Sequence, residues 1–261
     1  MKKKDKNKVY FIGAGPGDPK YLTLEGREVL SECSFVFAMR PYPETFAEFL
    51  EGKDLADPFE YDFKKIDQEV NRQLKNGSVG FIIPGDMMVF SPFLPLVDWF
   101  GERSRVIAGV GILNAAAALL KRTLDMTSVS HCVVLTSPKH IDRDGEKGEL
   151  ARLAALSGTL VLYMNNRPIS QLVSELGDRY APETPVAVIY RIGLPEEKVY
   201  RGTVATIADV VGDDDLFGLE SGEPSMAIII IGDVLTSRSD PKFWDRRKKQ
   251  FWDKRYRVHR V

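Results

Sequence analysis

Three times in the first half of the chain, an apolar run ends in a glycine-containing turn that leads towards a helical pattern. The three segments are VYFIGAGPGDP from residue 9, VGFIIPGD from residue 79 and SRVIAGVG from residue 104. Unbroken runs of Val, Ile and Phe are typical of strands that are buried on both faces. Because such strands alternate here with amphipathic stretches, the pattern predicts an α/β protein with parallel strands.

The same rhythm restarts in the second half, after the helical stretch GILNAAAALLKRTLDMTS. Further strands are expected in HCVVLTS, TLVLYM, TPVAVIYRI and SMAIIIIGDV. We place a hinge at 121–127. The chain then divides into an N-terminal α/β domain at 1–122, a C-terminal α/β domain at 123–237 and a basic, aromatic tail at 238–261.

Helix ends are indicated by capping residues. Thr23 is expected to cap a helix at its start, and Gly77 and Gly158 to cap two others at their ends. In the tail, Trp244, Phe251 and Trp252 recur at nearly helical spacing, which favours docking of a terminal helix onto the body over contact with RNA.

The composition excludes several function classes. The 36 Lys and Arg residues against 37 Asp and Glu residues give a formal charge of -1, so no overall field attracts nucleic acid or an anionic membrane. The longest apolar runs are too short to span a bilayer, and MKKKDKNK leads into a strand, not a signal peptide. Cys33 and Cys132 lie in apolar segments, which indicates buried thiols in a reducing compartment. We therefore expect a cytoplasmic protein with neither nucleic acid nor membrane as partner.

The first turn does not match the common phosphate-binding loops. Its glycines are spaced by two and followed by Asp18 and Pro19, unlike a dinucleotide or nucleoside-triphosphate loop. A rigid turn with Asp18 facing a cleft and a plain structural turn both remain open. The three histidines are scattered, so we expect no metal site and no Ser-His-Asp hydrolase.

Taken together, these segments resemble the tetrapyrrole methylases, which are S-adenosylmethionine-dependent methyltransferases of cobalamin and porphyrin (sirohaem) biosynthesis. VYFIGAGPGDPKYLTLEGREVL resembles the family's first signature, PGDMMVF its second loop, and AGVGILNAAAALL the turn that follows. TPVAVIYRIGLPEEKVYRGTV and SMAIIIIGDVL are similar to its C-terminal segments, so the resemblance extends from Lys8 to Leu235. Among the family's branches, the precorrin-4 or cobalt-precorrin-4 C-11 methyltransferases are the most similar.

The resemblance implies a two-domain α/β fold, in which each lobe is a mixed or mostly parallel sheet flanked by helices. It also implies a homodimer with S-adenosylmethionine between the lobes and a small-molecule tetrapyrrole as substrate. The implied cofactor-binding residues are Pro16, Gly85, Asp86, Met87, Phe90, Val110, Gly111, Tyr163, Met164, Arg191 and Ile192. The implied substrate-binding residues are Gly15, Gly17, Asp18 and Arg40, with Asp18 also the candidate catalytic residue and Arg191 a second candidate for binding substrate carboxylates. No metal is required.

Within these motifs the chain departs from the family pattern. Met87 replaces a proline, Ser91 stands where a glycine is usual, and the third turn has lost its proline and both hydroxyl groups. Two alternatives therefore stay open. One is a methyltransferase of the same fold that acts on another corrinoid or on a macromolecule, and the other is a non-catalytic paralogue that binds S-adenosylmethionine or a tetrapyrrole.

Overall fold

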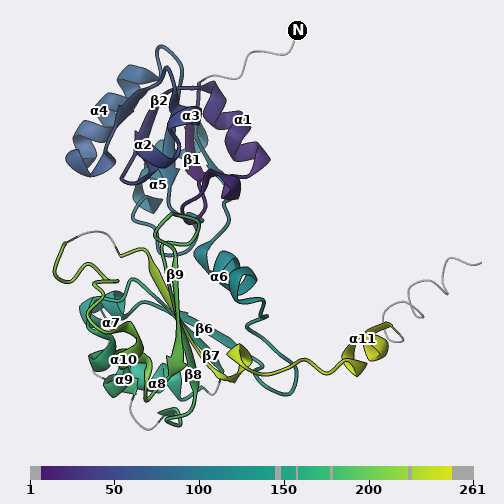
Figure 1. Ribbon diagram of the computed structural model, residues 1–261. Coiled ribbons are helices and arrows are strands. Elements are labelled where there is room, and N and C mark those ends of the chain that lie inside the picture. The colour runs from purple at the N-terminus through teal and green to yellow at the C-terminus, as the bar shows by residue number, and fades with distance from the viewer. Residues whose placement is uncertain (1–6, 145–147, 157, 177–178, 223–224, 249–261) are drawn as a thin grey trace, which may run out of the picture.

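The protein consists of two lobes, each built on a five-stranded sheet (Figure 1). The computed structural model describes residues 7–144, 148–156, 158–176, 179–222 and 225–248. The upper lobe in Figure 1 contains the first half of the chain, and the lower lobe contains the second half. The α/β class and the two-lobed arrangement that the sequence predicts are confirmed.

All strand pairs of the upper sheet are parallel, in the order β3-β2-β4-β1-β5. Its strands are β1 (Val9–Gly13), β2 (Cys33–Ala38), β3 (Asp54–Ala56), β4 (Ser78–Ile83) and β5 (Ser104–Ile107). Its helices are α1 (Leu24–Glu32), α2 (Tyr42–Thr45), α3 (Ala47–Leu50), α4 (Phe63–Gln73) and α5 (Leu94–Phe100), with short 3₁₀ turns η1 (Pro19–Tyr21), η2 (Pro58–Glu60) and η3 (Gly101–Arg103).

Both faces of this sheet are covered, which explains the unbroken apolar runs. Alternate residues of each strand point to opposite faces. Phe11 and Phe81 stack at 4.9 Å between ring centroids on the face covered by α4 and α5. Ile12 and Ile82 lie on the other face, beneath α1, α2 and α3.

The lower sheet is mixed, in the order β6-β7-β10-β8-β9. Its strands are β6 (Val133–Thr136), β7 (Thr159–Tyr163), β8 (Pro185–Tyr190), β9 (Lys198–Thr203) and β10 (Ala227–Ile231). β10 pairs antiparallel with both β7 and β8, and β6 pairs parallel with β7. The carboxyl ends of β6, β7 and β8 therefore lie at the same edge of the sheet.

Helices cover one face of the lower sheet, and a single helix from the middle of the chain covers part of the other. The first group comprises α7 (Pro138–Asp144), α8 (Glu149–Ala154), α9 (Ile169–Leu176) and α10 (Ile207–Val211). The single helix is α6 (Ile112–Leu120), in which Ala115, Ala116 and Leu120 pack against β7, β8 and β10. By packing, α6 belongs with the lower lobe. The division of the chain at residue 122 stays a prediction, and these contacts favour one nearer 108–111.

Two of the three predicted caps are wrong. Thr23 does cap α1, accepting a hydrogen bond from the Gly26 N–H over 3.0 Å. α4, however, has Leu74 at its C-cap, and α8 has Ala155. Gly77 and Gly158 are instead places of close approach, because a Cβ there would lie 2.4 Å from the Ser34 Oγ and from the Cys132 Sγ, respectively.

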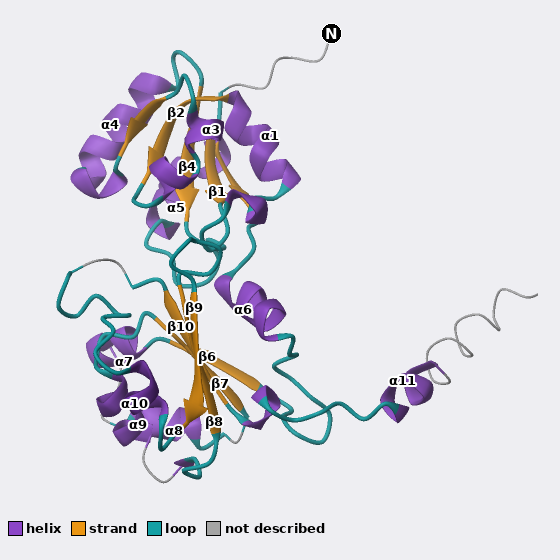
Figure 2. Ribbon diagram, viewed as in Figure 1, coloured by secondary structure: helices purple, strands orange, loops and turns teal. Residues whose placement is uncertain are grey.

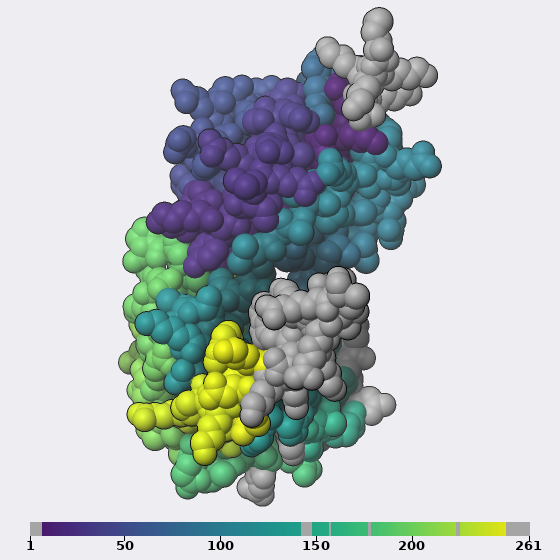
Figure 3. All heavy atoms as spheres, turned by 90° about the vertical axis from the view of Figure 1, so that its right-hand side faces the viewer, coloured from purple at the N-terminus to yellow at the C-terminus, as the bar shows by residue number. Residues whose placement is uncertain are grey.

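The described part of the tail does not dock onto the body, contrary to our prediction. The turn η5 (Asp233–Leu235) precedes the tail, whose helix α11 (Lys242–Arg247) stands away from the lower lobe (Figure 1). The Trp244 residue is 71% exposed and α11 has no buried residue. Phe251 and Trp252 lie outside the described residues. Figure 3 views the molecule from the side of α11.

Both cysteines are free thiols, of which Cys33 is buried, as predicted, and Cys132 only half-buried. None of the described helices has the length and apolar character needed to cross a membrane.

Candidate functional site

The three glycine-containing turns of the upper sheet lie side by side, because they follow the adjacent parallel strands β4, β1 and β5. Figure 2 shows these loops gathered between the two sheets. Two backbone hydrogen bonds join the first turn to the second. The Gly15 N–H donates to the Gly85 carbonyl over 3.1 Å, and the Gly85 N–H donates to the Gly15 carbonyl over 2.8 Å. The buried Tyr42 hydroxyl also donates to the Gly15 carbonyl, over 2.8 Å.

The glycines of these turns have two different roles. A Cβ on Gly13 would lie 2.6 Å from the Gly109 nitrogen, and one on Gly109 would lie 2.2 Å from the Gly85 carbonyl oxygen. These two residues must be glycine for the turns to pack. By contrast, a Cβ on Gly85 or Gly111 would meet no atom nearer than 3.7 Å and 3.9 Å, respectively. The backbone at the half-buried Gly111 is therefore open to the approach of a ligand, whereas Gly85 is buried and its N–H and carbonyl both bond to Gly15.

Asp86 fixes the second turn to the third. Its Oδ1 accepts a hydrogen bond from the Met88 N–H, and its Oδ2 accepts one from the Gly109 N–H, both over 2.8 Å. The Met87 side chain packs into the upper core beside Phe93, so only its backbone can reach a ligand. The prediction that Asp86 binds the cofactor stays a prediction, since both of its carboxylate oxygens accept hydrogen bonds from the protein's own backbone.

Asp18 begins η1 in the first turn. Its Oδ1 accepts from the Lys20 N–H over 2.8 Å, and its Oδ2 lies 3.1 Å from the Lys20 Nζ. The hydrogen bond from the Lys20 backbone holds the pKa of Asp18 below its usual value, with a smaller contribution from the Lys20 ammonium group. With its pKa lowered, this carboxylate stays ionised at neutral pH and is a weaker base than an ordinary aspartate. The predicted catalytic role of Asp18 stays a prediction.

The first turn of the upper lobe packs directly against the turn that follows β8 in the lower lobe. A Cβ on Gly17 would lie 2.6 Å from the Ile192 carbonyl oxygen, and one on Gly193 would lie 2.9 Å from the Asp18 Cβ. Pro16 is buried at this junction. The structure thus brings the predicted residues of the first turn together with Ile192, whose side chain is itself buried against α6.

An aromatic cluster makes a second contact between the lobes. The Phe90 ring, from the turn after β4, lies 5.3 Å from the His140 ring and 5.3 Å from the Tyr163 ring, measured between centroids. Tyr163 ends β7 and His140 lies in α7. Burial raises the pKa of Tyr163 to about 12, so it is a neutral phenol at neutral pH.

Strained backbone recurs in the predicted site. Of the five described non-glycine residues with positive φ, three belong to this site, Phe90, Met164 and Arg191, with φ values of 55°, 46° and 49°; the other two are Lys121 and Ser128. Residues other than glycine rarely adopt this conformation, and where they do it often marks a functional site. Each of the three follows a strand that ends at the junction of the lobes, after β4, β7 and β8.

The two candidate arginines differ in their surroundings. Arg191 lies at the junction, with its guanidinium 5.5 Å from the centre of the Tyr190 ring and its Nη1 3.6 Å from the Glu196 Oε1. The Arg40 side chain, beyond the carboxyl end of β2, is 87% exposed and lies 3.9 Å from the Glu44 Oε1. Both are placed at the edges of the sheets that face the junction.

Sequence reasoning missed two residues that the fold brings next to the site, His140 and the buried Arg167. His140 follows the end of β6 and Arg167 follows the end of β7. Their positions after strands were the only signal available in the sequence. Within the described ranges, no three His, Cys, Asp or Glu side chains are grouped as metal ligands.

Comparison with known proteins gives a consistent result. The family model of the tetrapyrrole (corrin/porphyrin) methylases matches residues 8–208. The cobalt-precorrin-4 C(11)-methyltransferase of Methanocaldococcus jannaschii is 30% identical over 246 residues, which cover 91% of this chain and 90% of that protein. The precorrin-4 C(11)-methyltransferase of Mycobacterium tuberculosis is 32% identical, and the match covers 88% of this chain and 92% of that protein.

Solved structures share the fold. A cobalt precorrin-4 methyltransferase superposes with a TM-score of 0.71 at 24% identity, covering 88% of this chain and 96% of that one. A uroporphyrin-III C-methyltransferase from Thermus thermophilus, solved with S-adenosylhomocysteine, superposes with a TM-score of 0.66 at 23% identity, covering 88% of this chain and 99% of that one.

Proposed function

Because the chain belongs to the tetrapyrrole (corrin/porphyrin) methylase family and is therefore a methyltransferase, we propose that it methylates a ring carbon of precorrin-4 or cobalt-precorrin-4 in cobalamin biosynthesis. The names of its relatives support this substrate. The structural observation that carries the proposal is the open backbone at Gly111, at the junction where the ends of β7 and β8 meet the upper lobe.

The residues at the junction fit S-adenosylmethionine, the cofactor that the family resemblance implies. The rings of Phe90 and Tyr163 offer apolar faces for an adenosyl group, and the open backbone at Gly111 lets a flat group approach it. Met87, Met164, Val110 and Ile192 would contribute through their backbone or through apolar contacts. When bound, this cofactor supplies a methyl group that is already activated on a sulfonium.

The chain's own residues would then orient the cofactor and the substrate relative to each other. The turns held by Asp86 and by the Gly15 and Gly85 backbone form a fixed wall for the reacting groups, which favours in-line attack. Arg191, and Arg40 at the exposed rim, are placed to bind substrate carboxylates. The Asp18 carboxylate, with its lowered pKa, is suited to accept hydrogen bonds from pyrrole N–H groups.

We also propose, from the family resemblance, that the protein is a cytoplasmic homodimer. Two apolar side chains of α5, Leu94 and Trp99, are exposed, which supports an interface between copies. The exposed Phe63 of α4 extends this apolar surface, since its ring centroid lies 5.5 Å from that of Trp99. Light scattering on the purified protein tests the proposal, because a mass equal to one chain would contradict it.

The site is tested by the variant Gly111→Ala. Gly111 has an ordinary φ of −63° and free space around its Cα, so the added methyl group should leave the free energy of unfolding within about 0.5 kcal/mol of wild type. If the cofactor reaches this backbone, the same methyl group should weaken binding of S-adenosylhomocysteine about tenfold or more in calorimetric titration. Gly109→Ala is the matched control, because it must clash with the Gly85 carbonyl and destabilise the fold.

Unchanged binding in Gly111→Ala would contradict this placement of the cofactor. The substrate is tested separately by incubation of the wild-type protein with S-adenosylmethionine and precorrin-4 or cobalt-precorrin-4, followed by mass spectrometry of the product. Cofactor binding without methylation of either compound would overturn the proposed substrate and favour another tetrapyrrole or a ligand-binding role.

A further inference from the structure

A buried arginine lies directly beside the segment of β7 that we assign to the cofactor. Arg167 follows Tyr163 by four residues, and the whole residue is only 7% exposed. A buried guanidinium is costly unless it is paired and hydrogen-bonded. Its partners therefore identify what this residue holds in place.

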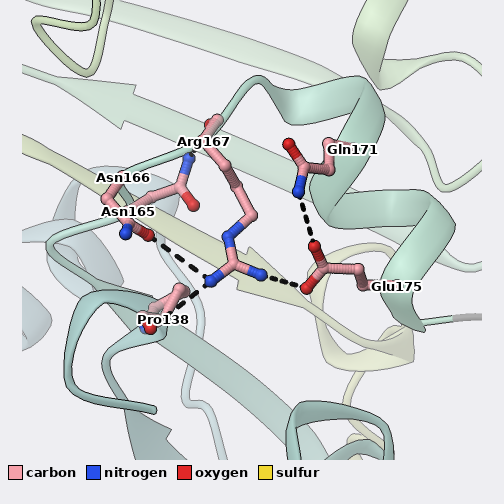
Figure 4. Close-up of polar contacts among 6 residues, drawn as sticks. All are labelled: Pro138, Asn165, Asn166, Arg167, Gln171 and Glu175. Carbon is pink, nitrogen blue, oxygen red and sulfur yellow. Dashed lines mark hydrogen bonds and ion pairs between the residues drawn. The ribbon is translucent and has the colours of Figure 1, made fainter. Parts of the chain in front are cut away.

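Arg167 connects three segments of the lower lobe (Figure 4). Its Nη1 forms an ion pair with the Glu175 carboxylate of α9. Its Nη2 donates to the Pro138 carbonyl at the start of α7, over 3.4 Å, and lies 3.5 Å from the Asn166 Oδ1. Glu175 is oriented in turn by Gln171, whose Nε2 donates to its Oε1 over 2.9 Å.

The turn that carries Arg167 is itself held from within. The Asn165 Nδ2 donates to the Arg167 carbonyl over 2.5 Å. Immediately before it, Met164 has the strained φ of 46°. A strained residue keeps its conformation only when its surroundings fix it, so these contacts help to maintain Met164.

Two of the segments joined by Arg167 also carry the lower-lobe rings of the aromatic cluster. Pro138 begins the helix that contains His140, and Arg167 belongs to the turn after Tyr163. Phe90 of the upper lobe packs against both rings, at 5.3 Å each. The spacing between His140 and Tyr163 therefore depends on the link between the turn after β7 and the start of α7.

We propose that Arg167 is a positioning residue of the cofactor site: through Glu175 and the Pro138 carbonyl it fixes Tyr163 and Met164 relative to His140. This inference rests on the proposed function, because Tyr163 and Met164 are assigned to the cofactor there. The flat guanidinium reaches both partners at once, whereas an ammonium group presents a single nitrogen. Lysine at this position is expected to keep the ion pair and lose the link to α7.

The test compares Arg167→Met, Arg167→Lys and Glu175→Gln with wild type in the full-length protein. Binding of S-adenosylhomocysteine is measured by calorimetry at a temperature at which circular dichroism shows each variant folded. Since a binding segment that is no longer held in its bound conformation must be ordered on binding, which lowers affinity, we expect at least about a tenfold rise in Kd for Arg167→Met and a smaller rise for Arg167→Lys. Hydrogen exchange of the ligand-free variants should become faster at 138–141 and 161–168.

A control separates positioning from general destabilisation. Val70 is fully buried in α4, in the upper core. Val70→Ala should lower the melting temperature but leave the Kd within about twofold of wild type, since a folded protein binds with its native affinity. If Arg167→Met fails to fold, Glu175→Gln, which keeps the size of the side chain, provides the same comparison.

The possible results are distinct. If wild type binds and the folded Arg167 and Glu175 variants bind equally well, the positioning role is overturned while the proposed function stands. If wild type itself does not bind S-adenosylhomocysteine, the proposed function fails and this inference fails with it. Weaker binding together with faster exchange confined to the two segments would support the inference.

Discussion

At the scale of single residues, the two aspartates of the glycine-containing turns use their carboxylates on the protein's own backbone. Asp86 accepts from the Met88 and Gly109 N–H groups, and Asp18 accepts from the Lys20 N–H. Replacing Asp86 by alanine would therefore leave two backbone donors without their partner and rearrange two turns at once. A loss of ligand binding in that variant would not distinguish a cofactor contact from a change in turn shape, which is why Gly111→Ala is the sharper test.

Cys33 gives a prediction on pH. Burial raises the pKa of its thiol from 9.0 to about 12, an effect larger than the opposing influence of the Lys53 charge. Since the folded pKa is the higher one, the contribution to stability is complete below the unfolded pKa and is lost as the pH rises through 9 towards 12. Between about pH 8 and about pH 10, this thiol alone should lower the free energy of unfolding by about 1.4 kcal/mol.

Urea unfolding of wild type and Cys33→Ala at both pH values isolates this contribution, because all other titrating groups are common to the two proteins. The variant should lose less stability than wild type over the same interval. An equal loss in both would mean that the thiol is not protected from ionisation.

The residues that could be predicted from the sequence are those whose role follows from their place after a strand. Gly85 and Gly111 lie at the junction because they follow parallel strands of the upper sheet, and Arg191 lies there because it follows β8 of the lower sheet. Gly77 and Gly158 were misread as caps, since their role depends on Ser34 and Cys132, which only the folded chain brings near them.

At the scale of elements, α6 is the connection between the lobes and packs with the second one. Ala116 is fully buried against the lower sheet, whereas Ala118 on the same helix is exposed. We expect Ala116→Leu to destabilise the protein by about 1–3 kcal/mol through overpacking, and Ala118→Leu to change stability by less than about 0.5 kcal/mol. Leucine and alanine differ little in helix propensity, so urea unfolding of the two variants compares packing alone. Equal stabilities would contradict the placement of α6.

The elements found from the sequence are those with an unbroken apolar run. β3 and β9 were missed for a physical reason. β3 has only three residues at the edge of its sheet, and β9, KVYRGT, is an edge strand whose side chains are exposed or half-buried. Neither has the apolar signal of a covered strand. The sequence also contained no sign of the contacts that link Arg167 to α7 and α9. Pro138 lies 29 positions before Arg167 and Glu175 lies 8 positions after it, and only the folded lobe brings the three together.

At the scale of the whole molecule, the Phe90 cluster is one of the contacts that join the two lobes. Phe90→Gly removes the apolar burial of the ring and both ring contacts, worth about 0.5–1.5 kcal/mol each, whereas relief of the positive φ returns only about 1–2 kcal/mol. We therefore expect a net loss of about 1–2 kcal/mol in the free energy of unfolding, together with weaker binding of S-adenosylhomocysteine to the folded variant and faster hydrogen exchange at 84–92 and 161–164.

Phe59→Ala serves as the control for loss of an aromatic side chain, since Phe59 lies on the exposed surface of the same lobe. It should leave both ligand affinity and exchange at the junction unchanged. A Phe90→Gly protein that binds the ligand as tightly as wild type would contradict a role for this cluster in bringing the lobes together.

The order of the strands has a consequence for synthesis of the protein. Every strand of the first sheet lies before residue 108, whereas the site also needs β7 and β8, which end at residues 163 and 190. During translation, the first lobe can fold on the ribosome while its glycine-containing turns still face solvent. The apolar side of α6 then emerges before the strands that cover it, so a chain stalled near residue 150 would present a folded lobe with an uncovered helix and no site. The quality-control machinery for stalled chains would therefore act on a partly folded, inactive chain whose uncovered helix promotes association with other chains.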